Sequence, residues 1–197
     1  MKRYAYCPVC GAAFDKSSAA PMSHLLHCAR CGFDFWQNSK PAVAAIVLRQ
    51  VAGQPHVLLT RRGIEPYKNM WDLPGGFLNN GEHPEQGLAR ELAEELGTSP
   101  LNPMLYRIEI EEYPRDDVAQ EARFVLSMYY RCDLPADAVL TPADDVEEAA
   151  WYPLHALPEA VAFPANRRVL MSLRESRAAG GAGAAAPKTP GSSSALR

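Results

Sequence analysis

The stretch of sequence that decides the fold is GFLNNGEHPEQGLARELAEELGT, from Gly76 to Thr98. Its leucines recur every four positions, which is the period of one side of a helix, at Leu88, Leu92 and Leu96. Pro84 suits the first turn of a helix, and Gly97 is a natural stop. The pattern therefore predicts a helix over residues 84–96, with one side packed against a core.

The same helix carries a concentrated negative charge. Glu91, Glu94 and Glu95 lie at spacings that place them on one face of the helix. The Arg90–Glu94 pair offsets only part of their repulsion. A divalent cation would remove the conflict, and oxygen ligands suit Mg²⁺ or Mn²⁺, which also bind phosphate oxygens and activate water. The simpler alternative is a solvated acidic face on a surface helix.

The loop before the helix adds two features of the same kind. Glu82 brings a fourth carboxylate, and Gly75 and Gly76 allow the backbone to approach a ligand closely. Together the loop and the helix predict a site that binds a metal and a phosphate. The three glutamates taken alone favour a solvated acidic face, whereas the whole combination of loop and helix favours the metal site.

The spacing of these residues resembles the Nudix box. The match covers Gly76, Glu82, Arg90-Glu91, Glu94-Glu95 and Gly97, and the segment Trp71–Gly75 resembles the usual lead-in. Thr98 departs from the family pattern, which has an aliphatic residue there, and we expect a small packing change. The resemblance implies an α/β fold, a Nudix α/β/α sandwich with a mixed sheet. It also implies hydrolysis of a pyrophosphate bond with divalent cations.

The resemblance further implies roles for individual residues. Glu91, Glu94 and Glu95 resemble the metal ligands, the Gly75 carbonyl a backbone ligand, and Glu82 a support or a more distant ligand. Catalysis falls to Glu91 and Glu94, with Arg90 orienting a glutamate. The general base varies within the family, so helix glutamates stay candidates beside later acids, which are Glu121, Asp144, Asp145, Glu147 and Glu148.

Several residues near the box are candidates for contacting the substrate. Those just before it are Arg61, Arg62, Tyr67, Lys68 and Trp71. Their alternative roles are strand-end charge and core packing. We expect substrate contacts from Arg61, Trp71 and Glu148.

Four of the five cysteines form two CxxC pairs, Cys7/Cys10 and Cys28/Cys31, and each pair is followed by a glycine. Four thiolates at this spacing suit tetrahedral Zn²⁺, with an iron site as the main competitor. A site with four protein ligands has no open position, so its role is structural. The sequence therefore predicts a small zinc ribbon.

Other residues around the cysteines have simpler interpretations. His24 and His27 are near enough to replace a ligand, but we expect them to be surface residues. Cys132, in a predicted strand, is expected in the core. Three aromatic residues are expected to pack against the following domain, with stacking on nucleobases as the alternative: Phe33, Phe35 and Trp36.

These patterns divide the chain into three parts. We expect a zinc ribbon at 1–36, a Nudix hydrolase domain at 41–177, and a disordered tail rich in Ala, Gly, Ser and Pro at 178–197. Within the second part, strands are predicted at residues 42–49, 56–62, 104–111, 123–132 and 150–152. A second helix is predicted at residues 164–176.

The bulk properties limit the partners. A formal net charge of −3 and a pI near 6.0 give no global basic surface, so a nucleic-acid partner is not expected, although a local patch is compatible with these values. No apolar run approaches the roughly 18 residues of a membrane span, and the first residues do not resemble a signal peptide. We expect a cytoplasmic protein with no membrane partner.

The order of the modules bears on the substrate. A zinc ribbon before a Nudix domain resembles NADH pyrophosphatases and relatives that act on ADP-ribose or FAD-like dinucleotides. NADH pyrophosphatases carry a Ser-Gln-Pro-Trp-Pro-Phe-Pro array after the box, where this chain has YRIEIEEYPR at 106–115, so NADH specificity is not expected. Pro114, sixteen residues beyond Thr98, matches a tendency of ADP-ribose pyrophosphatases. ADP-ribose or a related dinucleotide is the expected substrate.

Two other functions stay open at this point. One is a non-catalytic regulator that senses a nucleotide and uses the zinc ribbon to bind nucleic acid or protein. The other is a hydrolase that removes a nucleotide cap from RNA. By resemblance alone, a homodimer is also expected.

Overall fold

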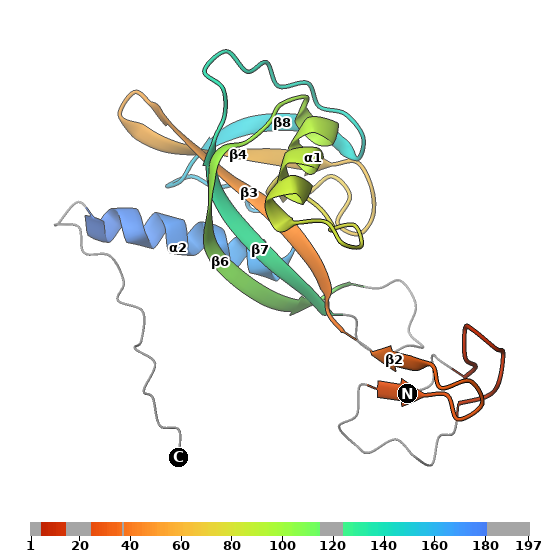
Figure 1. Ribbon diagram of the computed structural model, residues 1–197. Helices are drawn as coiled ribbons and strands as arrows, with labels where there is room; N and C mark the ends of the chain where they lie inside the picture. Colours follow the sequence, from red (N-terminus) through yellow and green to blue (C-terminus); the bar gives the residue numbers. More distant parts are fainter. Residues whose placement is uncertain (1–4, 15–24, 37, 115–123, 181–197) are drawn as a thin grey trace, which may run out of the picture.

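The computed structural model of the protein describes residues 5–14, 25–36, 38–114 and 124–180. Two strands, β1 (Leu25–His27) and β2 (Asp34–Trp36), form a hairpin in the N-terminal part. The remaining strands are β3 (Lys40–Val51), β4 (Gln54–Arg62), β5 (Trp71–Asp72), β6 (Leu101–Glu112), β7 (Phe124–Asp133) and β8 (Val146–Pro153). The helices are α1 (Pro84–Leu96) and α2 (Pro164–Gly180) (Figure 1).

Strands β3 to β8 form one mixed sheet. Its order is β5-β4-β3-β7-β6, with β8 paired to β4. β3 lies parallel to β7 from Lys40 to Val47 and pairs antiparallel with β4 only from Leu48 to Val51. On its other edge, β4 pairs with β8 from His56 to Arg62. The sheet therefore opens into two halves that share β3.

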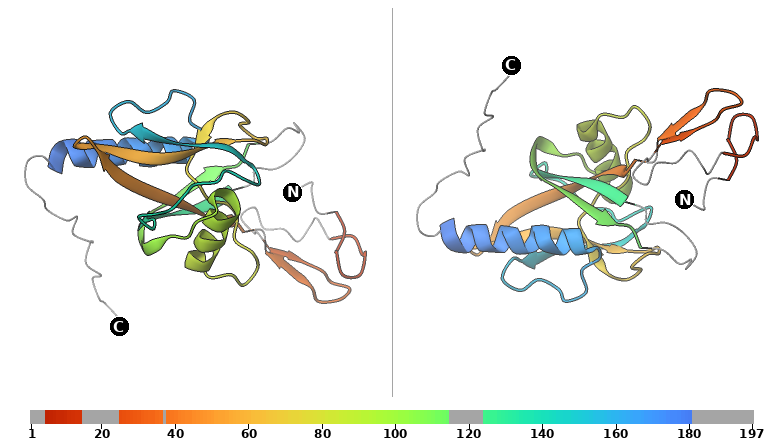
Figure 2. Two further views of the ribbon diagram at one scale, coloured as in Figure 1. Left: turned by 90° about the horizontal axis from the view of Figure 1, so that it is seen from above. Right: turned by 90° about the horizontal axis from the view of Figure 1, so that it is seen from below.

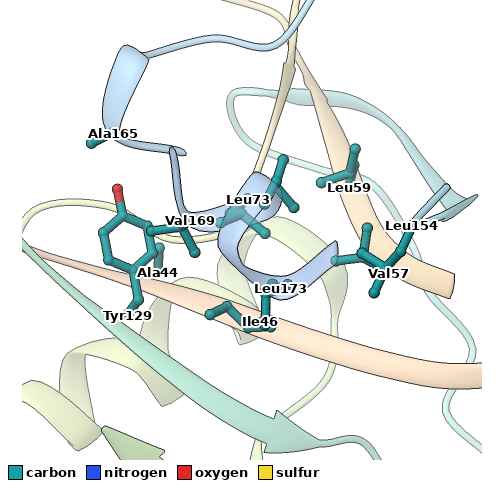
Figure 3. Close-up of a cluster of buried hydrophobic side chains, with 11 residues drawn as sticks. Ala44, Ile46, Val57, Leu59, Leu73, Tyr129, Leu154, Ala165, Val169 and Leu173 are labelled. Carbon is teal, nitrogen blue, oxygen red and sulfur yellow. The ribbon is translucent and has the colours of Figure 1, made fainter. Parts of the chain in front are cut away.

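The two helices cover opposite sides of β3 and β7 (Figure 2). Side chains alternate along β3, so its residues divide between two cores. On the α1 side, Val43, Ala45 and Val47 belong to a cluster with Leu88, Leu92 and Leu96. On the α2 side, Ala44 and Ile46 belong to a cluster with Val169, Leu170 and Leu173 (Figure 3). This arrangement confirms the predicted α/β/α sandwich.

Helix α1 has the predicted bounds, and its ends show why. His83 precedes the helix in an extended conformation, and its Nδ1 accepts from the Glu85 N–H at 3.4 Å. Gly97 ends the helix with a φ of 67°, which favours glycine. Thr98 is buried, and its N–H donates to the Leu92 carbonyl. Within the described residues, no helix has the length and hydropathy of a membrane span.

The other predicted elements are present with small shifts. The strands predicted at 42–49, 56–62, 104–111 and 150–152 lie within β3, β4, β6 and β8. The strand predicted at 123–132 corresponds to β7, while residue 123 lies outside the described residues. Helix α2 continues to Gly180, so the tail predicted to be disordered from Ala178 is wrong for its first three residues. Residues 181–197 lie outside the described part of the chain.

The N-terminal part has a small core of its own. Cys7, Phe14, Leu26 and Cys28 are buried, and Phe33 and Phe35 pack against them. The expectation that the aromatic residues pack against the main domain is therefore wrong for Phe33 and Phe35. So small a cysteine-centred core needs its own apolar cover. Trp36 is 61% exposed, whereas Cys132 is buried as predicted.

Candidate active site

The loop that leads to α1 lies against the central strand. Backbone N–H groups of Val43 and Ala45 donate to the carbonyl oxygens on either side of Gly75, at 2.9 and 2.8 Å. Gly75 lies between these two carbonyl groups and close against β3, where an added Cβ would collide with the Val43 carbonyl. Its N–H donates to Glu95 Oε2 at 2.9 Å. The loop thus connects the central strand to the acidic face of α1.

Arg90 is the centre of an ion-pair network on that face. Its Nε donates to Glu82 Oε1 at 2.8 Å. Its Nη1 donates to Glu91 Oε1 at 2.8 Å and to Glu94 Oε2 at 2.9 Å. Its Nη2 donates to the Phe77 carbonyl at 3.0 Å. One guanidinium therefore holds three carboxylates and the loop backbone together, an arrangement that suits an orienting residue.

Glu82 is committed to this network. Hydrogen bonds from Arg90 and from the Asn79 N–H hold the pKa of Glu82 down to about 2. In return Glu82, followed by Glu91, raises the pKa of Arg90 above its usual value. Of the two roles expected for Glu82, support and more distant ligand, this geometry favours support.

Glu95 lies on the inner side of the same helix and is only 5% exposed. Burial, together with the charges of the nearby Asp145 and Glu91 carboxylates, raises its pKa to about 9, while the Gly75 N–H opposes the shift. Burial also raises the pKa of Glu91, and the charges of Glu94 and Asp145 add to that shift. Carboxylates crowded in this way need a proton or a cation between them.

The glutamate oxygens do not converge as tightly as the cysteine sulfurs. Among the described residues, Cys7, Cys10, Cys28 and Cys31 are the only group whose potential ligand atoms all lie within 4.8 Å of one another. Glu82, Glu91 and Glu94 instead turn toward Arg90. The structure thus brings the predicted ligands to one face, and a cation would require side-chain rotations to complete its ligand set.

The acids after the box differ in their surroundings. Asp145 is half-buried and close enough to Glu91 and Glu95 to raise the pKa of each. Asp144 is exposed. Glu121 lies outside the described residues. Asp145 is therefore the later acid that the fold brings to the site.

Arg61 forms ion pairs with Glu147 and Glu148, the two remaining acids after the box. Its Nη1 lies 3.2 Å from Glu147, and its Nε lies 3.0 Å from Glu148. Trp71 contacts Tyr152 edge to face, with ring centroids 4.8 Å apart. These contacts favour the alternative roles of strand-end charge and core packing, and the substrate contacts expected of Arg61, Trp71 and Glu148 stay predictions.

An aromatic cluster borders the box loop. Phe77 contacts Tyr113, and Tyr113 contacts Phe163, each at a centroid distance of 5.7 Å. Tyr67 contacts Phe163 edge to face with ring centroids 5.0 Å apart, and the Arg62 guanidinium lies 5.0 Å from the Phe163 ring. Phe77 is 46% exposed. Tyr67 and Arg62 were sequence candidates, whereas the other three aromatic residues come from separate segments that no local motif connects.

A buried polar network joins this cluster to the lead-in of the box. Arg62 Nη1 donates to Asp72 Oδ2 at 3.0 Å, and the Leu73 N–H donates to Asp72 Oδ1 at 2.8 Å. Asn166 also donates to Asp72 and accepts from the Tyr129 hydroxyl. Burial raises the pKa of Asp72 to about 6, although Arg62 opposes the shift. The network fixes the lead-in against the start of α2.

The cysteines form a second candidate site. Cys7 Sγ lies 3.7 Å from Cys31 Sγ, and Cys10 Sγ lies 3.6 Å from Cys28 Sγ. The backbone N–H of Cys31 lowers the pKa of Cys28 to about 6. Four converging sulfurs, with backbone N–H groups that favour thiolate, fit a tetrahedral Zn²⁺.

His27 is not part of the four-cysteine group that the described residues form. His27 Nδ1 lies 2.7 Å from Asp34 Oδ1, and the imidazole is largely exposed. It is a surface residue, as predicted. His24 lies outside the described residues.

Gly75→Ala is expected to lower the free energy of unfolding by about 3 kcal/mol. Gly75 has a φ of 142°, and an added Cβ would collide with the Val43 carbonyl and the Ala44 Cα. The matched control is Gly53→Ala in the β3–β4 turn, where a Cβ meets nothing within 4 Å and only the positive φ costs about 1 kcal/mol. Urea denaturation measures both, and equal losses would contradict the close approach of the loop to β3.

Comparisons with known proteins agree with this geometry. The NUDIX domain family matches residues 38–173. The NAD-capped RNA hydrolase NudC of Pseudomonas aeruginosa is 26% identical over 182 residues, which are 92% of this chain and 59% of the relative. An 8-oxo-dGTP diphosphatase of Haemophilus influenzae is 31% identical over 132 residues, which are 66% of this chain and 89% of the relative.

A solved structure shows the same fold. The crystal structure of a NUDIX hydrolase from Nitrosomonas europaea aligns with a TM-score of 0.63 and 27% identity, covering 90% of this chain and 94% of that one. The chain spans 59% of the length of NudC, and the relatives differ in the substrates that they are named for. The family match covers more than half of the chain, and the chain belongs to the NUDIX domain family.

Proposed function

We propose that the protein hydrolyses the pyrophosphate bond of a nucleoside diphosphate linked to another group, with ADP-ribose or a related NADH- or FAD-like dinucleotide as substrate. The observation that carries the proposal is the buried Glu95 carboxylate, which lies near Asp145 and Glu91 and accepts from the Gly75 N–H. Such crowding of like charges is costly unless the site works with a cation.

The donor set fits Mg²⁺ or Mn²⁺. All of its candidate atoms are oxygens, from Glu91, Glu94, Glu95, Asp145 and the Gly75 carbonyl, and hard divalent cations prefer such ligands. When bound, the cation supplies charge neutralisation at the phosphates and an acidified water. The sequence offered Asp145 as a candidate general base, and its role as a metal ligand is proposed in addition.

The side chains around the cation site have separate tasks. Glu82 keeps Arg90 in position, and Arg90 orients the carboxylates of Glu91 and Glu94. We assign removal of the water proton to a carboxylate oxygen of Glu94, because its side chain is 47% exposed at the surface of the site. Glu91 and Glu95 are held further inside and act as ligands.

We assign binding of one nucleobase of the dinucleotide to the aromatic cluster. Phe77 follows the two glycines of the loop directly, and its ring is partly open to solvent. A planar base stacks well on such a ring. The Arg62 guanidinium beside Phe163 adds a positive charge next to this surface.

The cysteine module supports the choice of a dinucleotide. The match to NudC covers 92% of the chain, so it extends beyond the domain at 38–173 into the cysteine module. We assign the four cysteines to a structural Zn²⁺.

The five cysteines form no disulfide, and cysteines stay reduced in a reducing compartment, which favours the cytoplasm. A homodimer is proposed from resemblance to Nudix enzymes with N-terminal extensions.

A product assay tests the function. Purified protein with Mg²⁺ or Mn²⁺ is incubated with ADP-ribose, NADH, FAD, diadenosine polyphosphates and nucleoside triphosphates. AMP release is expected from ADP-ribose-type dinucleotides and is expected to disappear in the Glu94→Gln, Glu95→Gln double variant. Equal hydrolysis by the wild type and the double variant would falsify the assigned site.

The same assay separates the alternatives. A regulator that only senses nucleotides binds ADP-ribose without releasing AMP from any substrate. When capped RNA is added to the substrates, a cap-removing hydrolase yields 5′-monophosphate RNA, and its substrate binding weakens steeply with salt.

A further inference from the structure

A groove of about 580 Å³ runs between α2 and β6. Its lining includes three arginines, Arg107 from β6 and Arg167 and Arg168 from α2. Pro164, Met171 and Ser172 complete one helix face, and Glu175 closes the far end. These helix positions repeat at three and four residues, so they form a single stripe along α2. A basic stripe of this kind stands out in a chain whose formal net charge is −3.

Two of the arginines are held in place by one carboxylate. Glu109 has a side chain only 11% exposed, and its Oε1 lies 2.5 Å from Arg107 Nε. Its Oε2 lies 2.8 Å from Arg168 Nη2. Each guanidinium has further N–H donors beyond this contact. Glu109 thus fixes the two side chains while leaving donors for a second anion.

The N-terminus of α2 does not supply the anion site by itself. Glu111 Oε2 already accepts from the Ala165 N–H at 2.9 Å. Tyr106 on β6 contacts Ser172 through its hydroxyl, which closes the floor of the groove against the helix. The arginines are therefore the groups that an anionic chain would meet.

The groove starts where the aromatic cluster ends. Pro164 is the first residue of the stripe and follows Phe163 directly in the sequence. From Pro164 to Glu175 the helix rises by about 16 Å, which is the length of a few nucleotide units. A chain that leaves the aromatic cluster at Phe163 would therefore continue along the groove.

We propose that this groove binds the phosphodiester backbone of an RNA segment attached to the nucleotide whose pyrophosphate bond is cleaved. This inference rests on the proposed function and extends its substrate from a free dinucleotide to the same dinucleotide carried as the cap of an RNA. Guanidinium groups bind phosphate oxygens with charge-assisted hydrogen bonds, and each contact releases a counterion. Glu109 and Glu175 offset part of the positive charge of the three arginines. We therefore expect the groove to bind only a short RNA segment next to the cap.

The test compares Arg167→Glu with Arg174→Glu. Both variants reverse one arginine charge on α2, but Arg174 does not line the groove. Hydrolysis is measured on a free dinucleotide and on a short RNA carrying the same dinucleotide as its 5′ cap. For Arg167→Glu, kcat/KM is expected to fall about fivefold or more on the capped RNA while staying within about twofold on the free dinucleotide. Arg174→Glu is expected to match the wild type on both.

The outcomes separate this inference from the proposed function. Unchanged hydrolysis of capped RNA by Arg167→Glu, or an equal loss in both variants, overturns the groove. Hydrolysis of neither substrate by the wild type removes the proposed function, and binding then decides. In that case, fluorescence anisotropy with a 5′-monophosphate RNA must show affinity that weakens with salt and with Arg167→Glu but not with Arg174→Glu.

Discussion

Glu95→Gln is expected to lower kcat/KM about a thousandfold, because it removes a metal-binding charge from the proposed site. The substitution keeps the size of the side chain, and an amide oxygen can still accept from the Gly75 N–H. Steady-state AMP release with saturating Mg²⁺ measures the loss. Glu85→Gln is the matched control, since Glu85 is an exposed glutamate in the first turn of the same helix and is expected to leave kcat/KM unchanged.

The same variant is expected to be more stable than the wild type when no Mg²⁺ or Mn²⁺ is added. The pKa of Glu95 is raised to about 9, so the folded wild type keeps a proton that the unfolded chain releases above its ordinary pKa. The wild type therefore loses stability as the pH rises toward 9, whereas Glu95→Gln has no such group to ionise. A gain of roughly 1–2 kcal/mol at pH 8, with little gain at pH 5, is expected from urea denaturation.

AMP release and urea denaturation together distinguish the loss of a metal ligand at Glu95 from a folding defect. A variant that is both inactive and less stable at pH 8 would indicate that Glu95 is a structural acid. Full activity in Glu95→Gln would remove it from the site altogether. Only lost activity combined with gained stability matches a buried carboxylate kept for a cation.

Cys28→Ala is expected to abolish zinc binding and to unfold the N-terminal module. The module has few buried side chains beyond its cysteines, so the metal supplies most of its stability, about 10 kcal/mol in comparable sites. Zinc content by mass spectrometry and limited proteolysis before residue 40 measure the two effects. The matched control is Cys132→Ala, which removes a buried thiol from β7 and should keep both the zinc and the module.

Retention of stoichiometric zinc by Cys28→Ala would contradict the four-sulfur site. Iron in place of zinc would show in the same measurement and would select the competing metal. Loss of zinc in Cys132→Ala would place the metal in the main domain.

How well each feature could be predicted depended on how local its causes are. Helix α1 was predicted with its observed bounds, because Pro84 and Gly97 terminate it through backbone preferences that act within a few residues. The roles within the acidic run needed the fold. Asp145 precedes β8 and reaches the site, whereas Glu147 and Glu148 on β8 both pair with Arg61, and no spacing in the sequence distinguishes these acids.

The features that the sequence missed are assembled from distant segments. Phe77, Tyr113 and Phe163 meet only because the box loop, the end of β6 and the start of α2 converge. The groove could not be predicted from the arginines of α2 alone, because Arg107 of β6 forms part of its lining. The error at Phe33 and Phe35 has a similar origin, since the sequence does not tell which of two neighbouring cores an aromatic residue joins.

The hydrogen bonds from Val43 and Ala45 to the box loop have a consequence for substrate binding. Both donors lie in the middle of the strand that the two halves of the sheet share. The loop therefore takes its shape when the sheet forms, and the conformational entropy of ordering it is lost during folding. A nucleotide that arrives meets a preorganised backbone, so little of its binding energy is consumed in shaping the site.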